Sequence, residues 1–288
     1  MKPSFIIGGQ GRAGTSSLFY YLKQHPMICM PNNKEINYFK TGFYEDKDIN
    51  FYLKQFSTCQ DTSAKVVGEA SQSYMNDPNA AHSIHEFNPN MKFIFMLRDP
   101  AERAFSGYKR QIQSRGETRG FKQLIKDEEE KYGVCKQIRE SMYCKDIKKF
   151  INLFGRDNLH LIFFDRYCDP KKRKEILSET CEFLSVDKKF NFDMSAQNKN
   201  ESKMPLSITM QKFIAYTTDN WRVDDPFLVR LYKYIVRNGG NYLNHLYSFR
   251  ETPTLQEDVR EYLIDQYFLP DINCLEDLLD VDLTRWKT

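Results

Sequence analysis

The chain of 288 residues is 41% hydrophobic and 14% aromatic, which supplies a sizeable core and excludes a disordered chain. Its formal net charge of +3 is too small to indicate nucleic acid as a partner, although it is compatible with an anionic ligand. The apolar runs fall far short of the roughly 20 residues that a membrane span requires, so no membrane span is expected.

Strands and helices are predicted to alternate from the N-terminus onward. Short apolar runs predict buried strands in "SFIIGG", "KVVGEA", "MKFIFMLRDP" and "LHLIFFD". Capping residues and helical spacing predict helices in "TSSLFYYLKQ", residues 78–87, "PAERAFSGYKRQI" and "SMYCKDIKKFINLFG", with another after Pro170. Beyond about Met204 only helices are predicted. This order predicts an α/β fold with a mostly parallel central sheet flanked by helices and a helical C-terminal part, in a single domain over residues 1–288.

The cysteines and the N-terminus predict the cellular compartment of the protein. Seven cysteines are scattered along the chain without a C-x-x-C pair, which favours free buried thiols in a reducing compartment over disulfides or a zinc site. The first apolar run begins at Phe5, which leaves no room for the charged and apolar regions of a secretory signal. The sequence therefore predicts a cytoplasmic protein.

The stretch "IIGGQGRAGTSSLFYYL" is similar to a phosphate-binding loop that lacks its lysine. Gly9 and Gly14 bracket four residues, as in the P-loop G-x-x-x-x-G-K-[ST], but Thr15 stands at the lysine position. Backbone N–H groups at the start of a helix bind anions, and the Arg12 guanidinium can hold phosphate or sulfate oxygens with two donors. Hydroxyl donors follow at Thr15, Ser16 and Ser17. The alternative is a glycine turn that only closes a βα unit, with Arg12 in solvent.

Kinases and nucleotide triphosphatases are the rival class for this loop. Their lysine reaches the β- and γ-phosphates and their next Ser or Thr binds magnesium. A loop without that lysine suits a nucleotide that has no γ-phosphate and no metal. The strand "LHLIFFD" nevertheless ends in Asp165, as a Walker B strand would. This stretch by itself leaves a P-loop kinase or NTPase open.

A second group of polar residues lies in "MLRDPAERAFSGY". Arg98 comes at the end of a buried strand, and Ser106 follows about two helical turns later. Ligands bind at the carboxyl ends of the strands in α/β sheets, so the two side chains can converge on a further anionic group. In the alternative, Arg98 pairs with Asp99 or Glu102 and Ser106 is a surface residue.

Together these segments resemble the sulfotransferases that use 3'-phosphoadenosine-5'-phosphosulfate (PAPS), above all the carbohydrate (heparan-sulfate-type) branch and its bacterial relatives. "GQGRAGTSSL" is similar to the family's 5'-phosphosulfate loop, "LRDPAERAFSGY" to its 3'-phosphate strand and helix, and "HPMICMPNNKEINYF" to its HP…KE…FF segment. The stretch "YCKDIKKFINLFGRDNLHLIFFDRY" and the tail "YFLPDINCLEDLLDVDLTRW" also resemble family counterparts. The resemblance covers nearly the whole chain.

The resemblance implies an enzyme that moves the sulfuryl group of PAPS to a hydroxyl or amine without a metal and leaves adenosine 3',5'-bisphosphate. It makes Glu35 the general base and Arg12 a catalytic loop cation; His82 and His85, on a predicted helix, are rival bases. The implied nucleotide-binding residues are Gly11, Arg12, Ala13, Gly14, Thr15, Ser16, Arg98, Ser106 and Lys199. The expected acceptor is an oligosaccharide or a small molecule, which includes a non-sugar metabolite such as an alkaloid.

The chain departs from the family pattern at two places. Ala70, in "GEASQSYM", stands where the carbohydrate branch carries a second lysine. The family loop that closes over the nucleotide has its nearest candidate in "SAQNKNESKMP", with Lys199 or Lys203 as the cation. These departures bear on the acceptor and the rate more than on PAPS binding.

Overall fold

The computed structural model describes residues 2–59, 63–195, 204–218 and 252–288, together with a few positions between 219 and 251. The chain divides into two compact units. Unit 1 comprises residues 1–103, 140–198 and 264–288, and unit 2 comprises residues 104–139 and 199–263. A single domain over residues 1–288 stays a prediction.

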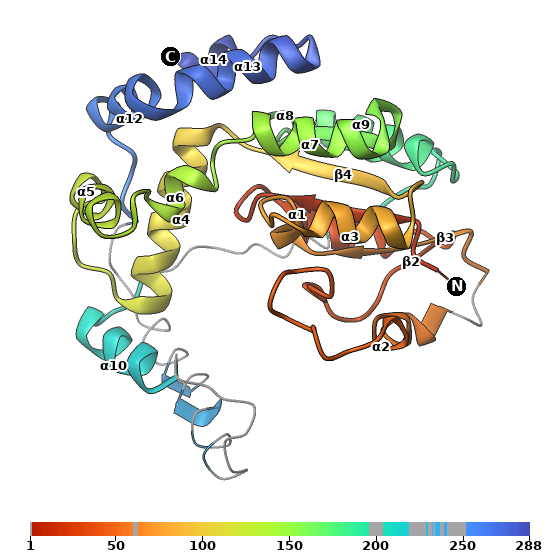
Figure 1. The fold of residues 1–288 in the computed structure, drawn as a ribbon, viewed down its shortest axis with the longest axis horizontal. Helices are drawn as coiled ribbons and strands as arrows, with labels where there is room; N and C mark the ends of the chain where they lie inside the picture. Colours follow the sequence, from red (N-terminus) through yellow and green to blue (C-terminus); the bar gives the residue numbers. More distant parts are fainter. Residues whose placement is uncertain are drawn as a thin grey trace. The chain divides into compact units, whose positions relative to one another are not determined.

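Unit 1 is built on a five-stranded sheet in the order β2-β3-β1-β4-β5 (Figure 1). The strands are β1 (Phe5–Gly9), β2 (Ile28–Cys29), β3 (Val66–Ala70), β4 (Lys92–Leu97) and β5 (Leu159–Phe163). Every pair of neighbours is parallel, with Phe5 of the central β1 opposite Gly68 on one side and Lys92 on the other. The predicted parallel α/β sheet is confirmed. The two-residue β2 was not predicted, because it is too short to leave an apolar pattern.

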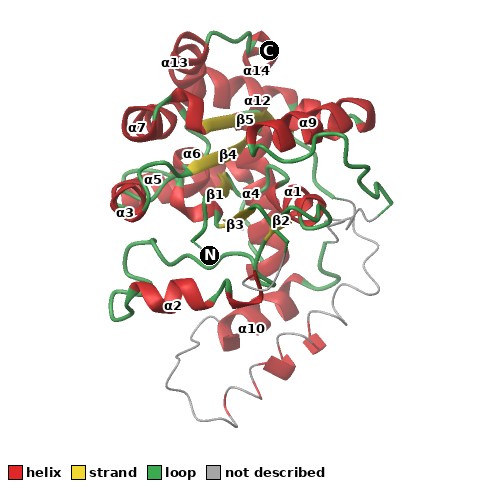
Figure 2. Cartoon of the chain, turned by 90° about the vertical axis from the view of Figure 1, so that its right-hand side faces the viewer, coloured by secondary structure: helices red, strands yellow, loops and turns green. Residues whose placement is uncertain are grey.

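Helices cover both faces of this sheet (Figure 2). One face carries α1 (Thr15–Leu22) and α9 (Pro170–Phe183), and the other carries α3 (Ala80–Phe87) and α7 (Cys144–Phe154). Alternate side chains of β4 point to opposite faces. Phe93 and Phe95 therefore pack on Phe150 of α7, with ring centroids 4.8 and 4.9 Å apart, while Ile94 and Met96 join the core beneath α1 and α9.

The C-terminal helices of unit 1 close over the α7 side of the sheet. Asp271 of α13 (Leu269–Leu279) accepts hydrogen bonds from the backbone N–H groups of Tyr143 (2.6 Å) and Cys144 (3.1 Å), so its carboxylate stabilises the start of α7. In α14 (Thr284–Lys287), Trp286 Nε1 donates to Asp165 Oδ2 over 3.3 Å. The remaining elements are α2 (Ile49–Lys54), α8 (Phe164–Cys168), a π-helix (Ile264–Phe268) and the short 3-10 turns Ser57–Cys59, Gln72–Tyr74 and Arg156–Asn158.

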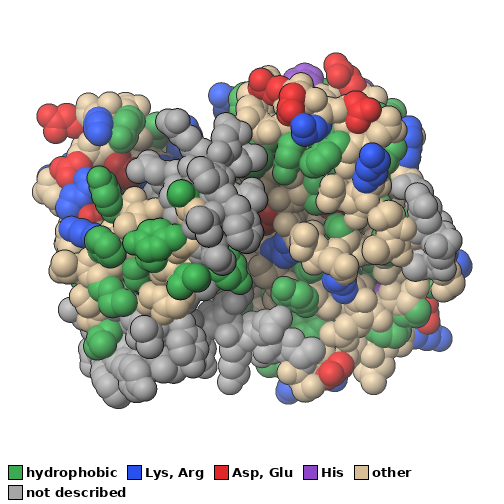
Figure 3. All heavy atoms as spheres, turned by 90° about the horizontal axis from the view of Figure 1, so that it is seen from below, with side chains coloured by type: hydrophobic (Ala, Val, Ile, Leu, Met, Phe, Trp, Pro, Cys, Tyr) green, Lys and Arg blue, Asp and Glu red, His purple; other side chains and the backbone are tan. Residues whose placement is uncertain are grey.

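The regular elements of unit 2 are all helices within the described residues, and loops such as residues 116–120 and 252–256 connect them. The described helices are α5 (Phe121–Tyr132), α6 (Lys136–Arg139), α10 (Ile208–Thr218) and α12 (Glu257–Leu263), and α4 (Pro100–Arg115) enters the unit after Arg103. In the described part of the chain beyond Met204, helices are thus the only regular elements, as predicted. Hydrophobic side chains reach the surface of the protein (Figure 3). Phe213 and Tyr216 of this unit are exposed. Within the described ranges of both units, each helix is too short or too polar to cross a membrane.

The prediction of free cysteines is wrong for four of the seven. Cys29 is bonded to Cys59 and Cys144 to Cys274, and the partners lie 30 and 130 positions apart in the sequence. Cysteines so far apart in the sequence show no local pattern, and only the fold brings them together. The three free cysteines are Cys135, Cys168 and Cys181. Burial raises the pKa of Cys135 and of Cys181 to about 11, so both are poor nucleophiles at neutral pH.

Candidate active site

The loop between β1 and α1 has the backbone of an anion site. Gly9 and Gly14 have φ of 95° and 91°, and Gly14 caps α1 without a side-chain hydrogen bond to the first turn. A side chain on Gly9 would place its Cβ 2.4 Å from the carbonyl oxygen of Met96, so the position requires glycine. Arg12 also takes a left-handed φ, 77°, inside the loop. The N–H groups at the start of α1 are therefore available to a ligand.

Arg103 supports this loop and was missed in the sequence. Its guanidinium is almost fully buried; Nε donates to the carbonyl oxygen of Gly11 over 3.2 Å, while Nη1 donates to Ser141 Oγ over 3.4 Å and Nη2 pairs with Glu140. A paired guanidinium in this position fixes the loop backbone rather than a ligand. An arginine on a helix is usually solvated, so the sequence held no signal for this role.

Arg98 lies at the loop, as the position at the end of β4 predicts. Its Nη1 donates to the carbonyl oxygen of Arg12 over 3.3 Å, and its guanidinium lies 4.9 Å from the ring centroid of Phe164. The alternative interpretation also holds in part, because Nη2 pairs with Glu102 Oε2 at 3.0 Å. Tyr143 Oη donates to the Arg98 carbonyl oxygen over 2.7 Å and so fixes its backbone. Arg98 thus lies within hydrogen-bond reach of the loop backbone, and its contact with a 3'-phosphate stays a prediction.

The other residues that were predicted to contact the nucleotide do not all lie beside Arg98. Ser106 is buried on α4 but belongs to unit 2, so its convergence with Arg98 stays a prediction. Lys199 and Lys203 lie outside the described residues. In the loop, Ala13 and Thr15 are buried. Ser17 Oγ forms a hydrogen bond with Tyr167 Oη over 3.0 Å. Ser16 Oγ accepts a hydrogen bond from the Lys34 ammonium.

Glu35 is held in a strained turn beside the end of β3. Its φ is 59°, its N–H donates to the carbonyl oxygen of Ala70 over 2.7 Å, and its Oε2 accepts from the backbone N–H of Gln72 over 3.2 Å. The side chain is 31% exposed. Burial raises the pKa of the carboxyl, and the nearby Lys34 ammonium opposes that rise. A partly buried carboxylate with a raised pKa is suited to take up a proton.

A buried carboxylate beneath this turn holds it in place. Glu69 is inaccessible to solvent and accepts hydrogen bonds from Tyr52 Oη (2.8 Å), Tyr74 Oη (3.1 Å) and Ser71 Oγ (2.5 Å). Ser71 Oγ in turn accepts from the N–H of Asn37, which like Glu35 has a left-handed φ. Burial raises the pKa of Glu69 to about 7. This network was not predicted, because a glutamate in a strand gives no indication of three hydroxyl partners.

A cavity of about 530 Å³ opens at Glu35. Aromatic and amide side chains line it with the carboxylate: Tyr20, Tyr44, Phe51, Asn33 and Gln55. Rings flanked by amides match the apolar faces and hydroxyl groups of a sugar or a similar polar molecule. The rival bases His82 and His85 lie on α3 and do not line this cavity.

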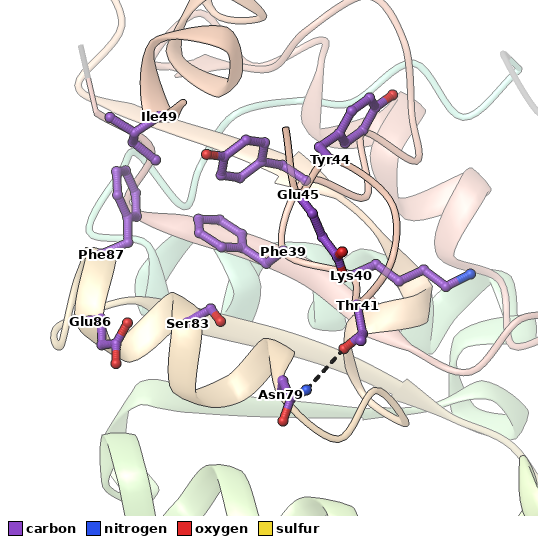
Figure 4. A pocket seen from close by; sticks show the side chains of 11 residues that line it. Phe39, Lys40, Thr41, Tyr44, Glu45, Ile49, Asn79, Ser83, Glu86 and Phe87 are labelled. Carbon is purple, nitrogen blue, oxygen red and sulfur yellow. Dashed lines mark hydrogen bonds between the residues drawn. The ribbon is translucent and has the colours of Figure 1, made fainter. Parts of the chain in front are cut away.

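A second cavity, of about 520 Å³, shares Tyr44 with the first (Figure 4). Phe39, Ile49 and Phe87 form its apolar side, and Asn79 Nδ2 donates to Thr41 Oγ1 over 3.3 Å across it. Lys40 extends away from the other labelled side chains. Glu35, the predicted general base, lines the first cavity and not this one, so we assign the chemistry to the first.

Fold and site thus define an α/β enzyme with a phosphate loop and a carboxylate cavity. No family model matches the chain. Its structure is similar to that of a sulfotransferase from Alicyclobacillus acidocaldarius, with a TM-score of 0.72 and 25% identity over the full length of both chains. In sequence it is 42% identical over 114 residues to the membrane-associated sulfotransferase kil1 of Dictyostelium discoideum, and 27% identical over 174 residues to human heparan sulfate glucosamine 3-O-sulfotransferase 5.

These segments are 38% and 57% of this chain, and the chain spans only 23% and 48% of the two relatives. The comparisons confirm the resemblance to sulfotransferases, and to carbohydrate and heparan sulfate sulfotransferases among sequence relatives. The chain has the sulfotransferase fold, and the relatives that it resembles are sulfotransferases.

Proposed function

We propose that the protein transfers the sulfuryl group of PAPS to a hydroxyl or amine of a carbohydrate acceptor, with Glu35 as the general base. The proposal depends on one observation, that the phosphate loop and the carboxylate cavity adjoin each other at Lys34. Lys34 Nζ donates to Ser16 Oγ at the start of α1 over 2.7 Å and lies 3.9 Å from Glu35 Oε1. A donor in the loop and an acceptor in the cavity would therefore meet at Glu35.

The residues suit each part of the reaction. Loop N–H groups and Arg12 hold the 5'-phosphosulfate, and Arg98 with Ser106 holds the 3'-phosphate. Glu35 takes the acceptor's proton as the acceptor atom bonds to sulfur. The bond from sulfur to the bridging oxygen breaks, and its electron pair stays on the 5'-phosphate of adenosine 3',5'-bisphosphate. Cations and N–H donors stabilise that charge, so the chain's own residues supply the required electrostatics.

The kinase alternative has little support in the site. Asp165, the acid at the end of the Walker-B-like strand, lies inside α8 and accepts from Trp286. A metal-binding aspartate needs its oxygens free for the ion. A non-sugar acceptor, such as an alkaloid, remains the second candidate, because the rings in the Glu35 cavity would also stack on an aromatic metabolite.

A cytoplasmic location stays a proposal. The two disulfides count against it, because such bonds form and persist mainly in oxidising compartments.

Transfer of label from radiolabelled PAPS tests the proposed acceptor class. The panel consists of an amino-sugar oligosaccharide, a neutral oligosaccharide and a phenolic alkaloid, each with wild type and with Glu35→Gln. We expect label on a sugar with wild type only. Label on the alkaloid alone would support the second candidate, and no transfer to any hydroxyl or amine would contradict the proposal.

A further inference from the structure

Lys34 contacts both halves of the site, the phosphate loop and the carboxylate of the cavity. Its ammonium donates to Ser16 Oγ over 2.7 Å and lies 3.9 Å from Glu35 Oε1, and its side chain is 16% exposed. The burial of an ammonium costs free energy, and a serine hydroxyl together with a carboxylate 3.9 Å away compensates for only part of that cost. Burial indeed lowers the pKa of Lys34, against the opposing effect of Glu35.

The neighbourhood of Lys34 also lacks another cation on β3. Residue 70, the last residue of that strand, is Ala70, and its carbonyl oxygen accepts from the N–H of Glu35 over 2.7 Å. Ala70 therefore lies directly beside the residue that follows Lys34. The turn thus carries a positive charge, that of Lys34, beside this end of β3.

We propose that Lys34 is a catalytic residue, which stabilises the negative charge that develops on the leaving phosphate. This rests on the proposed function. As the sulfur–oxygen bond breaks, its electron pair moves to the bridging oxygen of the 5'-phosphate, and the ammonium turns from Ser16 Oγ to that oxygen. The acceptor's proton goes to Glu35, so Lys34 keeps its own. An ammonium that meets more charge in the transition state than in bound PAPS accelerates the step.

The Lys34 ammonium also affects the pKa of Glu35, the proposed proton acceptor. Burial is the largest influence on the pKa of Glu35 and raises it, while Lys34 and, less strongly, Lys40 lower it. The buried Glu69, whose own pKa is raised in part by Glu35, lies on the opposite side. A general base must be ionised to act. Loss of the Lys34 charge should therefore raise the pKa of Glu35 and move the acidic limb of the pH–kcat profile to higher pH.

The test compares Lys34→Met, which keeps length but not charge, with Lys34→Arg and with Lys40→Met. Lys40→Met removes a charge that acts on Glu35 from further away and has no bond to the loop. We expect Lys34→Met to lower kcat about 10²-fold. The affinity for adenosine 3',5'-bisphosphate should fall about tenfold or more, while KM for PAPS stays within about threefold of wild type. Lys34→Arg should recover part of kcat, and Lys40→Met should stay within about threefold.

A merely structural lysine would give a different result. Equal losses in affinity for PAPS and for adenosine 3',5'-bisphosphate, with kcat and its pH profile unchanged, would overturn the role of Lys34 and leave the proposed function intact. A wild-type protein that neither binds the bisphosphate nor transfers sulfuryl groups would overturn both. Thermal unfolding of each variant separates misfolding from loss of function, and Lys34→Arg keeps the test valid if Lys34→Met unfolds.

Discussion

Glu35→Gln is expected to lower kcat about 10²-fold or more, while the Kd for adenosine 3',5'-bisphosphate stays within about threefold of wild type. Glutamine keeps the size of the side chain and can still accept from the Gln72 N–H, but it cannot take up the acceptor's proton. The nucleotide binds in the loop, so its affinity should not depend on that proton. Steady-state rates with a sugar acceptor and calorimetry with the bisphosphate measure the two effects.

Glu45→Gln is the matched control for this change. Glu45 is an exposed carboxylate that accepts from the N–H of Gly42 over 3.0 Å and lies in the second cavity, so its loss should alter kcat by less than about threefold. Near-normal turnover by the Glu35→Gln variant would exclude Glu35 as the general base. His82→Asn and His85→Asn would then identify which rival residue takes the proton.

Removal of the Cys144–Cys274 disulfide is expected to give the largest loss of stability. The bond joins the start of α7 to α13 and closes a loop of 130 residues, so the unfolded chain gains much freedom when it is cut. We expect Cys144→Ser with Cys274→Ser to lower the free energy of unfolding by about 2–5 kcal/mol. Cys29–Cys59 closes a loop of 30 residues and should cost less.

Urea unfolding without reductant measures both losses, with Cys168→Ser as the control, because Cys168 is a free and exposed thiol. That variant should unfold at the wild-type urea concentration. Thiol titration of the denatured wild type should find three free thiols. Seven titratable thiols, with unfolding unaffected by the double change, would restore the prediction of free cysteines.

The sheet and the phosphate loop could be predicted because their signals are local. A buried parallel strand such as β4 is a continuous apolar run, and a loop that must take positive φ shows its glycines, as at Gly9 and Gly14. The place of Arg98 beside the loop could be predicted for the same reason, because it follows a buried strand. Glu35 was predicted as the base from the family resemblance, and that role stays a prediction.

The remaining parts of the site depend on contacts between distant residues. Arg103 reaches back 92 positions to Gly11, and Glu69 accepts from Tyr52, 17 positions away, besides its near neighbours Ser71 and Tyr74. No spacing in the sequence indicates such partners. Lys34 is adjacent to Glu35 in the sequence, but its hydrogen bond to Ser16 is evident only in the fold.

Calorimetric titration of the wild type with adenosine 3',5'-bisphosphate tests the central claim, use of PAPS, most directly. The loop lacks the P-loop lysine, and Arg98 lies beside it to meet a 3'-phosphate. We therefore expect the bisphosphate to bind without magnesium, and ATP to bind at least about tenfold more weakly with or without the metal, because a lost charge-assisted contact costs about that much. Magnesium-dependent binding of ATP as tight as that of the bisphosphate would contradict the account.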